Sequence, residues 1–407
     1  MSAESAAAAP GVGGNRLPVA LYVHFPFCLS ICPYCDFVVV AGSAARGPRS
    51  RVAMLVDALV RELELRAPKR SVGLGSVYLG GGTPSLMSAE QVGRLLAAVD
   101  RCFGIGAGAE VTIEANPGAG ERGDLAGFRA AGVNRLSIGA QSLDAAELRR
   151  IGRRHAPRDV AATMREARRA GFDNLSLDLL YDMPGQTVKS WRETLAAALT
   201  LGPEHVSVYA LSLDDPAAEG LTGPFGDHLP LRPGARRWRE RARAEQDDDR
   251  AADMYLLADE MLAAAGLDWY EISNWARPGR ESRHNLVYWL GGAWEAVGPG
   301  AHAFDGGRTR RWNAASLERY LETLADGRLP PSSAEVIDPP TAQGERTILR
   351  LRTAVGLPLA GSEPSAARAL DWGIEAGLLV GKADGRAQLT ARGRLVADEL
   401  FVRLLPD

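Results

Sequence analysis

The sequence is poor in cysteine, in aromatic residues and in long apolar runs. No apolar run approaches the roughly 18 residues that a membrane-spanning helix needs. Residues 1–14 are rich in Ala and Gly and lack the basic and then apolar order of a signal peptide. The 47 basic and 50 acidic residues nearly cancel, so charge gives no reason to expect nucleic acid or an acidic surface as partner. We therefore expect a cytoplasmic protein, not itself transmembrane, with a disordered lead-in over residues 1–17.

Three of the four cysteines, Cys28, Cys32 and Cys35, form a CxxxCxxC array. A short loop with this spacing can ligate three irons of a [4Fe-4S] cubane and leave the fourth iron open for a small molecule. Three alternatives remain at this point. The thiolates could bind zinc with His24 as the fourth ligand, form a disulfide that leaves one thiol over, or pack as inert core residues. Cys102 lies far away at the end of a helical stretch, and we expect it to be dispensable for such a site.

Short apolar, β-branched segments alternate along the chain with amphipathic stretches of helical period. The segments predicted as strands are residues 19–24, 76–80, 110–114, 135–140, 174–181 and 205–211, and the clearest helices are 51–66, 89–102, 157–170 and 188–201. Strand–helix alternation of this kind implies an α/β fold with a parallel sheet. Six such units before residue 215 predict a partial (β/α)6 barrel rather than a complete eight-fold one.

Polar or glycine-rich features follow the predicted strands at the same end. Ligands of βα barrels bind on the loops at the C-terminal ends of the strands. The cysteine loop follows the first strand and residues 80–84, GGGTP, follow the second, where glycine lets the backbone approach a ligand closely. Glu114 and Gln141 end the third and fourth strands, and Asp178 lies within the fifth. Each feature alone could be a turn or a helix cap, but five on one rim indicate a binding site.

The pattern changes after residue 211. Residues 223–250 combine Pro, Gly and a dense arginine run, which we interpret as a solvated face or flexible insertion, with a phosphate- or propionate-binding patch as the second interpretation. We expect three regions after the lead-in: the barrel over residues 18–222, an inserted region with the HNxxYW motif over 223–335, and a smaller, mainly helical C-terminal domain over 336–407. The last region is expected to hold a hairpin near residues 380–389 and a final helix over 390–405.

At these residues a family resemblance becomes clear. Residues 22–28, YVHFPFC, with Cys32 and Cys35, resemble the start of the radical S-adenosylmethionine (SAM) enzymes and, more narrowly, of the oxygen-independent coproporphyrinogen III oxidase group. The resemblance implies a [4Fe-4S] cluster on the three cysteines, SAM chelated to its open iron, and electron transfer from the reduced cluster to SAM. It favours Arg153 over Arg154 as a cofactor contact. The residues that it places beside SAM are Tyr22, Tyr34, Gly81, Gly82, Thr83, Glu114, Gln141, Arg153 and Asp178.

Two features distinguish the chain from the oxidases of that group. The oxidases carry another cysteine two residues beyond the third, where this chain has Phe37. Residues 284–289, HNLVYW, form an HNxxYW motif that is typical of the heme chaperone branch of the same group. The resemblance to that branch implies heme as a further ligand, with His284 at its iron and His302 as the alternative ligand. Asp182 departs from the family, which commonly has glycine there, and Asp tolerates a positive φ better than most residues.

The resemblance therefore predicts a heme chaperone that binds heme and transfers it to heme-requiring apoproteins, which could be membrane-associated. The first alternative is an oxygen-independent coproporphyrinogen III oxidase that decarboxylates its substrate by radical chemistry. The second is a zinc-stabilised structural protein with no redox role. Nucleic acid is not expected as a partner, and a homodimer is left open.

Overall fold

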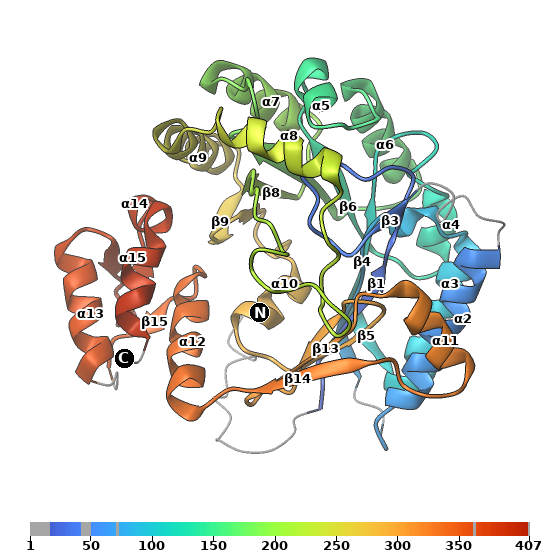
Figure 1. Cartoon of the computed structure of the whole chain (residues 1–407). Helices are drawn as coiled ribbons and strands as arrows, with labels where there is room; N and C mark the ends of the chain where they lie inside the picture. The colour runs from blue at the N-terminus through green and yellow to red at the C-terminus, as the bar shows by residue number, and fades with distance from the viewer. Residues whose placement is uncertain (1–16, 42–49, 71–72, 361–363, 406–407) are drawn as a thin grey trace.

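A twelve-stranded mixed sheet organises most of the chain. The computed structural model describes residues 17–41, 50–70, 73–360 and 364–405, so the predicted lead-in, apart from residue 17, lies outside the described residues. The strand order is β14-β13-β12-β11-β1-β4-β5-β6-β7-β8-β10-β9. The sheet curves into an open half-barrel with helices packed against its outer side (Figure 1).

The centre of the sheet confirms the predicted partial (β/α)6 barrel. Its six strands run parallel to one another in chain order, and each expected strand overlaps one of them. They are β1 (Ala20–Phe25), β4 (Leu74–Gly81), β5 (Ile105–Ala115), β6 (Arg135–Gln141), β7 (Leu175–Tyr181) and β8 (His205–Ala210).

Helices connect these strands and cover the convex face of the sheet. The four expected helices are confirmed to within one or two residues as α2, α3, α6 and α7. A capping box begins α3, where Ser88 Oγ accepts from Gln91 N at 3.2 Å and Gln91 Oε1 accepts from Ser88 N at 2.9 Å. The connecting elements are α2 (Ser50–Arg66), η2 (Pro84–Leu86), α3 (Ala89–Phe103), α4 (Leu125–Ala130), α5 (Ala145–Arg150), α6 (Pro157–Arg169) and α7 (Val188–Thr200).

The two faces of the barrel strands differ in polarity. Leu21 and Val23 of β1 belong to the main apolar core between sheet and helices, together with Leu59 of α2. The alternate residues of β1, Tyr22 and His24, point to the other face, which lines the inside of the half-barrel. Parallel strands covered on both faces usually read as continuous apolar runs. Along β1, by contrast, apolar and polar residues alternate, and successive side chains of a strand point to opposite faces. The inner face is therefore polar and lines a site rather than a core.

Six further strands, which were not predicted, extend the sheet at both edges. β11 pairs parallel with β1, followed by antiparallel β12, β13 and β14, whereas antiparallel β10 and β9 continue from β8. The region expected as an insertion, residues 223–335, thus supplies strands to both edges of the barrel sheet. Their bounds are β9 (Asp268–Glu271), β10 (Asn274–Ala276), β11 (Trp294–Val297), β12 (His302–Phe304), β13 (Thr309–Asn313) and β14 (Ser332–Val336).

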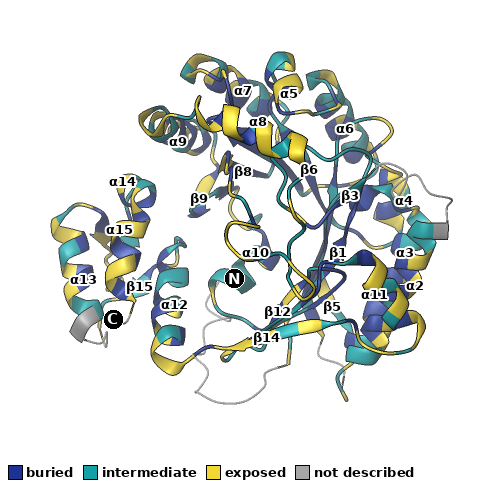
Figure 2. Cartoon of the chain, viewed as in Figure 1, coloured by how far each residue is buried: buried dark blue, intermediate teal, exposed yellow. Residues whose placement is uncertain are grey.

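The arginine run forms an ordered helix, α8 (Pro233–Arg243), followed by α9 (Asp248–Ala264). Its outer face is exposed, as Figure 2 shows, which fits the solvated-face interpretation. Arg239 does not fit this interpretation, because it is only 3% exposed and points inward. The expectation of a flexible insertion was therefore wrong for this part, since the apolar Ala242 lies one turn after Trp238 and packs the helix onto the barrel.

The C-terminal region has its own small core, which includes Leu370, Leu389 and Leu400. The predicted hairpin is confirmed as antiparallel β16 and β17, but the predicted final helix is broken at Val396 into short pieces. Among the described residues, no helix combines the length and apolar character needed to cross a membrane. The elements are α12 (Pro339–Leu351), β15 (Leu357–Pro358), α13 (Pro364–Glu375), β16 (Leu379–Gly381), β17 (Arg386–Leu389), α14 (Ala391–Leu395), α15 (Ala397–Phe401) and η3 (Val402–Leu404).

A buried carboxylate ties the added strands to the barrel. Glu62 of α2 is fully buried and pairs with Arg66 at 2.7 Å. It also accepts hydrogen bonds from Asn313 Nδ2 of β13 at 2.8 Å and from the hydroxyl of Tyr320, on α11 (Leu317–Ala325), at 2.6 Å. The amide of Gly298 donates a further bond of 2.9 Å. Four donors therefore satisfy one carboxylate where the returning chain meets α2.

Replacing Glu62 by Ala is expected to lower the free energy of unfolding by about 3–5 kcal/mol, because it leaves the nearly buried Arg66 without its counter-charge. Glu64 lies two residues further along α2, is 40% exposed and makes only 3.4 Å ion pairs. Glu64→Ala is the matched control and should change stability by less than about 1 kcal/mol. Urea unfolding of both variants checks this, and equal losses in the two would contradict a special role for Glu62.

Candidate cofactor site in the half-barrel

The three cysteines lie on a loop between the two short strands β2 (Phe27–Cys28) and β3 (Val40–Ala41), which pair in parallel. All three are partly buried free thiols, and the amide of Cys35 donates to the carbonyl of Cys32 at 3.1 Å. Burial raises the pKa of the Cys28 thiol to about 11 and raises the pKa of Cys35 still further. These two thiols are therefore protonated at neutral pH without metal, and metal binding must displace their protons.

A chain of hydrogen bonds joins two of the cysteines through side chains from other strands. Thr83 Oγ1 lies 3.6 Å from Cys28 Sγ and accepts from Asn116 Nδ2 at 3.0 Å. Asn116 Oδ1 accepts in turn from Arg153 Nη2 at 2.6 Å, and Arg153 Nη1 lies 3.7 Å from Cys32 Sγ. Donors directed at two sulfur atoms stabilise thiolates, so this arrangement suits cysteines that act as metal ligands.

Arg239 of α8 holds the same loop from the opposite side. Its Nη2 donates to the carbonyl of Tyr34 at 2.7 Å, its Nε donates to the carbonyl of Pro33 at 3.2 Å, and its Nη1 donates to the carbonyl of Asp214. The ring of Tyr34 packs against a separate apolar cluster that includes Leu180 of β7. One buried guanidinium therefore fixes the backbone between Cys32 and Cys35.

The glycine turn after β4 is shaped by close contacts with the chain before the cysteines. The amides of Gly82 and Thr83 donate to the carbonyls of Phe25 and Phe27 at 2.7 and 2.8 Å. A Cβ at Gly82 would lie 2.6 Å from the Phe27 carbonyl oxygen, so no other residue fits there without movement. Gly81 has φ of +113°, which also favours glycine. The turn thus lies directly against the start of the cysteine loop.

Two carboxylates predicted from strand position face the inside of the half-barrel. Glu114 accepts from the hydroxyl of Tyr78 at 2.8 Å and from the amide of Gly81 at 3.0 Å. Asp178 accepts from Ser137 Oγ at 3.0 Å. Burial raises the pKa of Glu114 to about 7, although the hydrogen bond from Tyr78 acts to lower it. Burial also raises the pKa of Asp178. A cation placed between them would favour their ionised forms.

The remaining predicted residues lie on the same side of the half-barrel. Gln141 has φ of +65°. Its side chain and that of Arg153 both lie close to Gly139, because a Cβ built on Gly139 would be 3.0 Å from Gln141 Nε2 and 3.3 Å from Arg153 Nη2. A positive φ at a non-glycine residue marks strain that is often kept for function. The hydroxyl of Tyr22 lies 3.0 Å from His24 Nδ1. Arg154 is exposed, so Arg153 is the arginine that reaches the cysteine loop.

The geometry of His24 argues against its use as a zinc ligand. Its Nε2 lies 2.8 Å from the Val38 carbonyl oxygen and its Nδ1 lies 3.0 Å from the Tyr22 hydroxyl, so both ring nitrogens have partners. Across the described ranges, no three or more His, Cys, Asp or Glu side chains are grouped closely enough to hold a metal ion.

Comparison with known proteins shows which family the chain resembles. Residues 22–198 match the radical SAM superfamily. The chain is 40% identical over 389 residues to the heme chaperone HemW of Mycobacterium tuberculosis (strain ATCC 25618 / H37Rv), covering 95% of each. It is 34% identical over 318 residues to the heme chaperone HemW of Escherichia coli (strain K12), covering 76% of this chain and 78% of that one. The chain belongs to the HemW family of radical SAM proteins.

A solved structure shares the fold of this HemW family member. Coproporphyrinogen III oxidase (HemN) from Escherichia coli, a radical SAM enzyme, aligns with a TM-score of 0.77 and 23% sequence identity. The alignment covers 96% of this chain and 91% of that one. The aligned part of the chain therefore shares the fold of that enzyme.

The HNxxYW motif of the HemW family member forms α10 (Arg283–Trp289), and its histidine is buried. His284 is 1% exposed, with Nδ1 2.9 Å from Ser76 Oγ and Nε2 2.7 Å from the Tyr288 hydroxyl. Its backbone amide donates to Glu110 Oε1 at 3.1 Å. Burial lowers the pKa of His284 to about 3, so its ring is neutral. Binding of iron by this ring would require it to give up one of these hydrogen bonds.

Two residues of the site were missed by sequence reasoning. Asn116 follows Glu114 at the end of β5, so the rule that ligands bind at strand ends could have found it. Arg239 is one of several arginines in α8, and only its place next to Trp238 on the packed side of the helix separates it from the others.

Asp182 does adopt φ of +54°, and Oδ1 of its side chain accepts from Arg250 Nε at 2.9 Å.

The raised pKa of Glu114 predicts a pH-dependent stability. Between about pH 5 and 7 the folded protein keeps this carboxyl protonated while the unfolded chain has released the proton, so stability falls as pH rises. Glu114→Gln should therefore gain stability relative to wild type between pH 5 and pH 8, by on the order of 1–3 kcal/mol. Urea unfolding at both pH values, with Glu64→Gln as control, measures this difference. A difference that is the same at both pH values would contradict the assignment.

Proposed function

We propose that the chain is a heme chaperone, which binds heme and transfers it to heme-requiring apoproteins in the cytoplasm. The observation that carries the proposal is the match at 40% identity to a heme chaperone HemW over 95% of both chains. A match of this extent covers the barrel, the α10 motif and the C-terminal region together. The acceptor proteins could be membrane-associated, and the chain could act as a homodimer.

We propose further that the half-barrel binds a [4Fe-4S] cluster and SAM. Cys28, Cys32 and Cys35 would hold the cluster, and the donors Thr83 and Arg153 near two of the sulfur atoms fit this role. When bound, the cluster supplies an electron for the reduction of SAM. The contacts proposed for SAM lie on the polar inner face and on the glycine turn. They are Tyr22, Tyr34, Gly81, Gly82, Thr83, Glu114, Gln141, Arg153 and Asp178.

His284 remains a prediction as the heme ligand, with His302 as the alternative. Their surroundings differ, because His284 is 1% exposed whereas the side chain of His302 is 48% exposed. A ligand that must accept heme and later release it to another protein needs access to the surface. Exposure therefore favours His302, and the family motif favours His284.

One observation keeps the oxidase as the second candidate function, since the fold is shared with HemN over 96% of the chain. Against it, Phe37 stands where the oxidases have another cysteine, and its side chain is exposed, with 63% of the residue accessible. An exposed phenylalanine supplies no metal ligand or thiol. The chaperone is therefore the function that these residues support best.

The two functions are separated on one sample of anaerobically reconstituted protein. We expect hemin to bind with a defined Soret band, and we expect no protoporphyrinogen IX from coproporphyrinogen III in the presence of SAM and a reductant. Authentic HemN in parallel shows that the assay works. Formation of protoporphyrinogen IX at the rate of HemN would overturn the chaperone proposal, as would a failure of the wild-type protein to bind hemin.

A further inference from the structure

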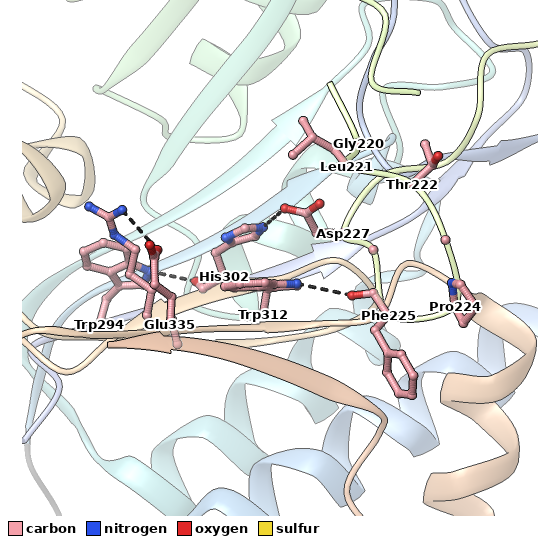
Figure 3. A pocket seen from close by; sticks show the side chains of 14 residues that line it. Gly220, Leu221, Thr222, Pro224, Phe225, Asp227, Trp294, His302, Trp312 and Glu335 are labelled. Atoms are coloured by element: carbon pink, nitrogen blue, oxygen red, sulfur yellow. Dashed lines mark hydrogen bonds and ion pairs between the residues drawn. The ribbon is translucent and has the colours of Figure 1, made fainter. Parts of the chain in front are cut away.

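A cavity of about 720 Å³ lies over the strands that extend the sheet beyond β1. Its floor comes from β11, β12, β13 and β14, and residues 220–227 form the facing wall (Figure 3). Pockets for small molecules commonly measure about 300–1,000 Å³, so this one could hold a ligand of considerable size. None of the residues proposed above to contact the cluster or SAM lines it.

The cavity offers flat aromatic surfaces held in fixed orientation. The imidazole of His302 stacks on the ring of Trp312, with centroids 5.8 Å apart and planes at 18°. The indole of Trp312 donates to the Phe225 carbonyl oxygen at 3.3 Å, and that of Trp294 donates to the His302 carbonyl oxygen at 2.8 Å (Figure 3). Aromatic rings fixed in this way offer apolar surface to a large aromatic ligand.

A series of ring contacts connects the HNxxYW motif to this cavity. His284 and Tyr288 meet edge to face at 5.1 Å, and Tyr288 meets Trp294 at 4.7 Å. Trp294 then contacts Phe304 of β12 at 5.3 Å. The motif therefore supports one wall of the cavity even though His284 itself is buried.

A carboxylate joins two histidines at the cavity. Asp227 Oδ2 lies 2.8 Å from His302 Nε2, and Asp227 Oδ1 lies 3.0 Å from His228 Nδ1. Histidines that bind metals usually donate their other ring N–H to a carboxylate, which fixes the tautomer and raises the basicity of the metal-binding nitrogen. When His302 donates to Asp227 from Nε2, its Nδ1 carries the free lone pair. A histidine in this setting is prepared to bind a metal.

We propose that this cavity is where the chain binds heme, with His302, supported by Asp227, as the ligand of the iron. The inference rests on the proposed chaperone function and assigns its ligand to a definite site. An imidazole suits the iron, and the indole rings of Trp294 and Trp312 supply apolar surface for the macrocycle. Arg310, which also lines the cavity, pairs with Glu335 at 3.6 Å and with Glu345, so it would meet a porphyrin carboxylate only by giving up one of these partners.

The assignment gives the motif a different role from direct ligation. His284, through its bond to the Tyr288 hydroxyl, positions the ring that packs against Trp294. It is thus a positioning residue, while the exposed His302 can bind and release cargo without unfolding of α10.

The test compares hemin with metal-free protoporphyrin IX in titrations of the full-length protein, followed by Soret absorbance and by quenching of tryptophan fluorescence. We expect His302→Ala to weaken hemin binding by about tenfold or more, to change the Soret band, and to leave protoporphyrin IX binding unchanged. Trp312→Ala should weaken both ligands, because it removes apolar surface from the cavity. Trp372→Ala, on α13 outside the cavity, is the matched control and should change neither.

The possible outcomes separate the two proposals. If wild type binds hemin and the double variant His302→Ala/His228→Ala binds it equally well, the cavity assignment is overturned while the chaperone function stands. The same holds if His284→Ala removes the Soret band and the double variant keeps it. If wild type binds no hemin, both proposals fail. Thermal unfolding of each variant distinguishes lost binding from lost folding.

Discussion

The position of the cysteine loop depends on two guanidinium groups that contact it from opposite sides. The loop between β2 and β3 forms no helix or strand, so its shape must come from outside contacts. Arg153 reaches Cys32 Sγ and Asn116, and Arg239 binds the carbonyl oxygens of Pro33 and Tyr34. Their planar arrays of N–H donors hold several acceptors at once, which a single lysine cannot do. Because Arg239 belongs to α8, a helix after the barrel strands, the cofactor site is complete only when the later part of the chain has folded.

The contrast between the two faces of the sheet links fold and function. The outer face carries apolar residues against the helices, while the inner face carries Glu114, Asp178 and hydroxyl groups that point into the half-barrel. An interior this polar would be costly as a core and suits a site for a charged cofactor. At the β1 edge the same inner face continues onto Trp294, His302 and Trp312 with a more aromatic character. One curved sheet thus has a polar half, where we propose that SAM binds, and an aromatic half, where we propose that heme binds.

Much of the barrel and its rim could be predicted from the sequence. Local periodicity locates the strands and helices, and ligands of βα barrels bind at the C-terminal ends of the strands. The cysteine loop, the glycine turn and Glu114 follow directly from where strands end. The strands β9–β14 could not be predicted in the same way, since they are three to five residues long and pair with barrel edges far away in sequence. The burial of His284 and the inward direction of Arg239 depend on tertiary packing, which no local pattern encodes.

We propose that the three cysteines hold a cluster with an open iron to which SAM binds. Electron paramagnetic resonance of the reduced, anaerobically reconstituted protein tests it most directly, with and without SAM. We expect about four irons per chain and a cluster signal that changes when SAM is added, in wild type and in Cys102→Ala alike. Cys32→Ala should lose the signal. A signal that SAM leaves unchanged, or a full cluster in Cys32→Ala, would contradict the account.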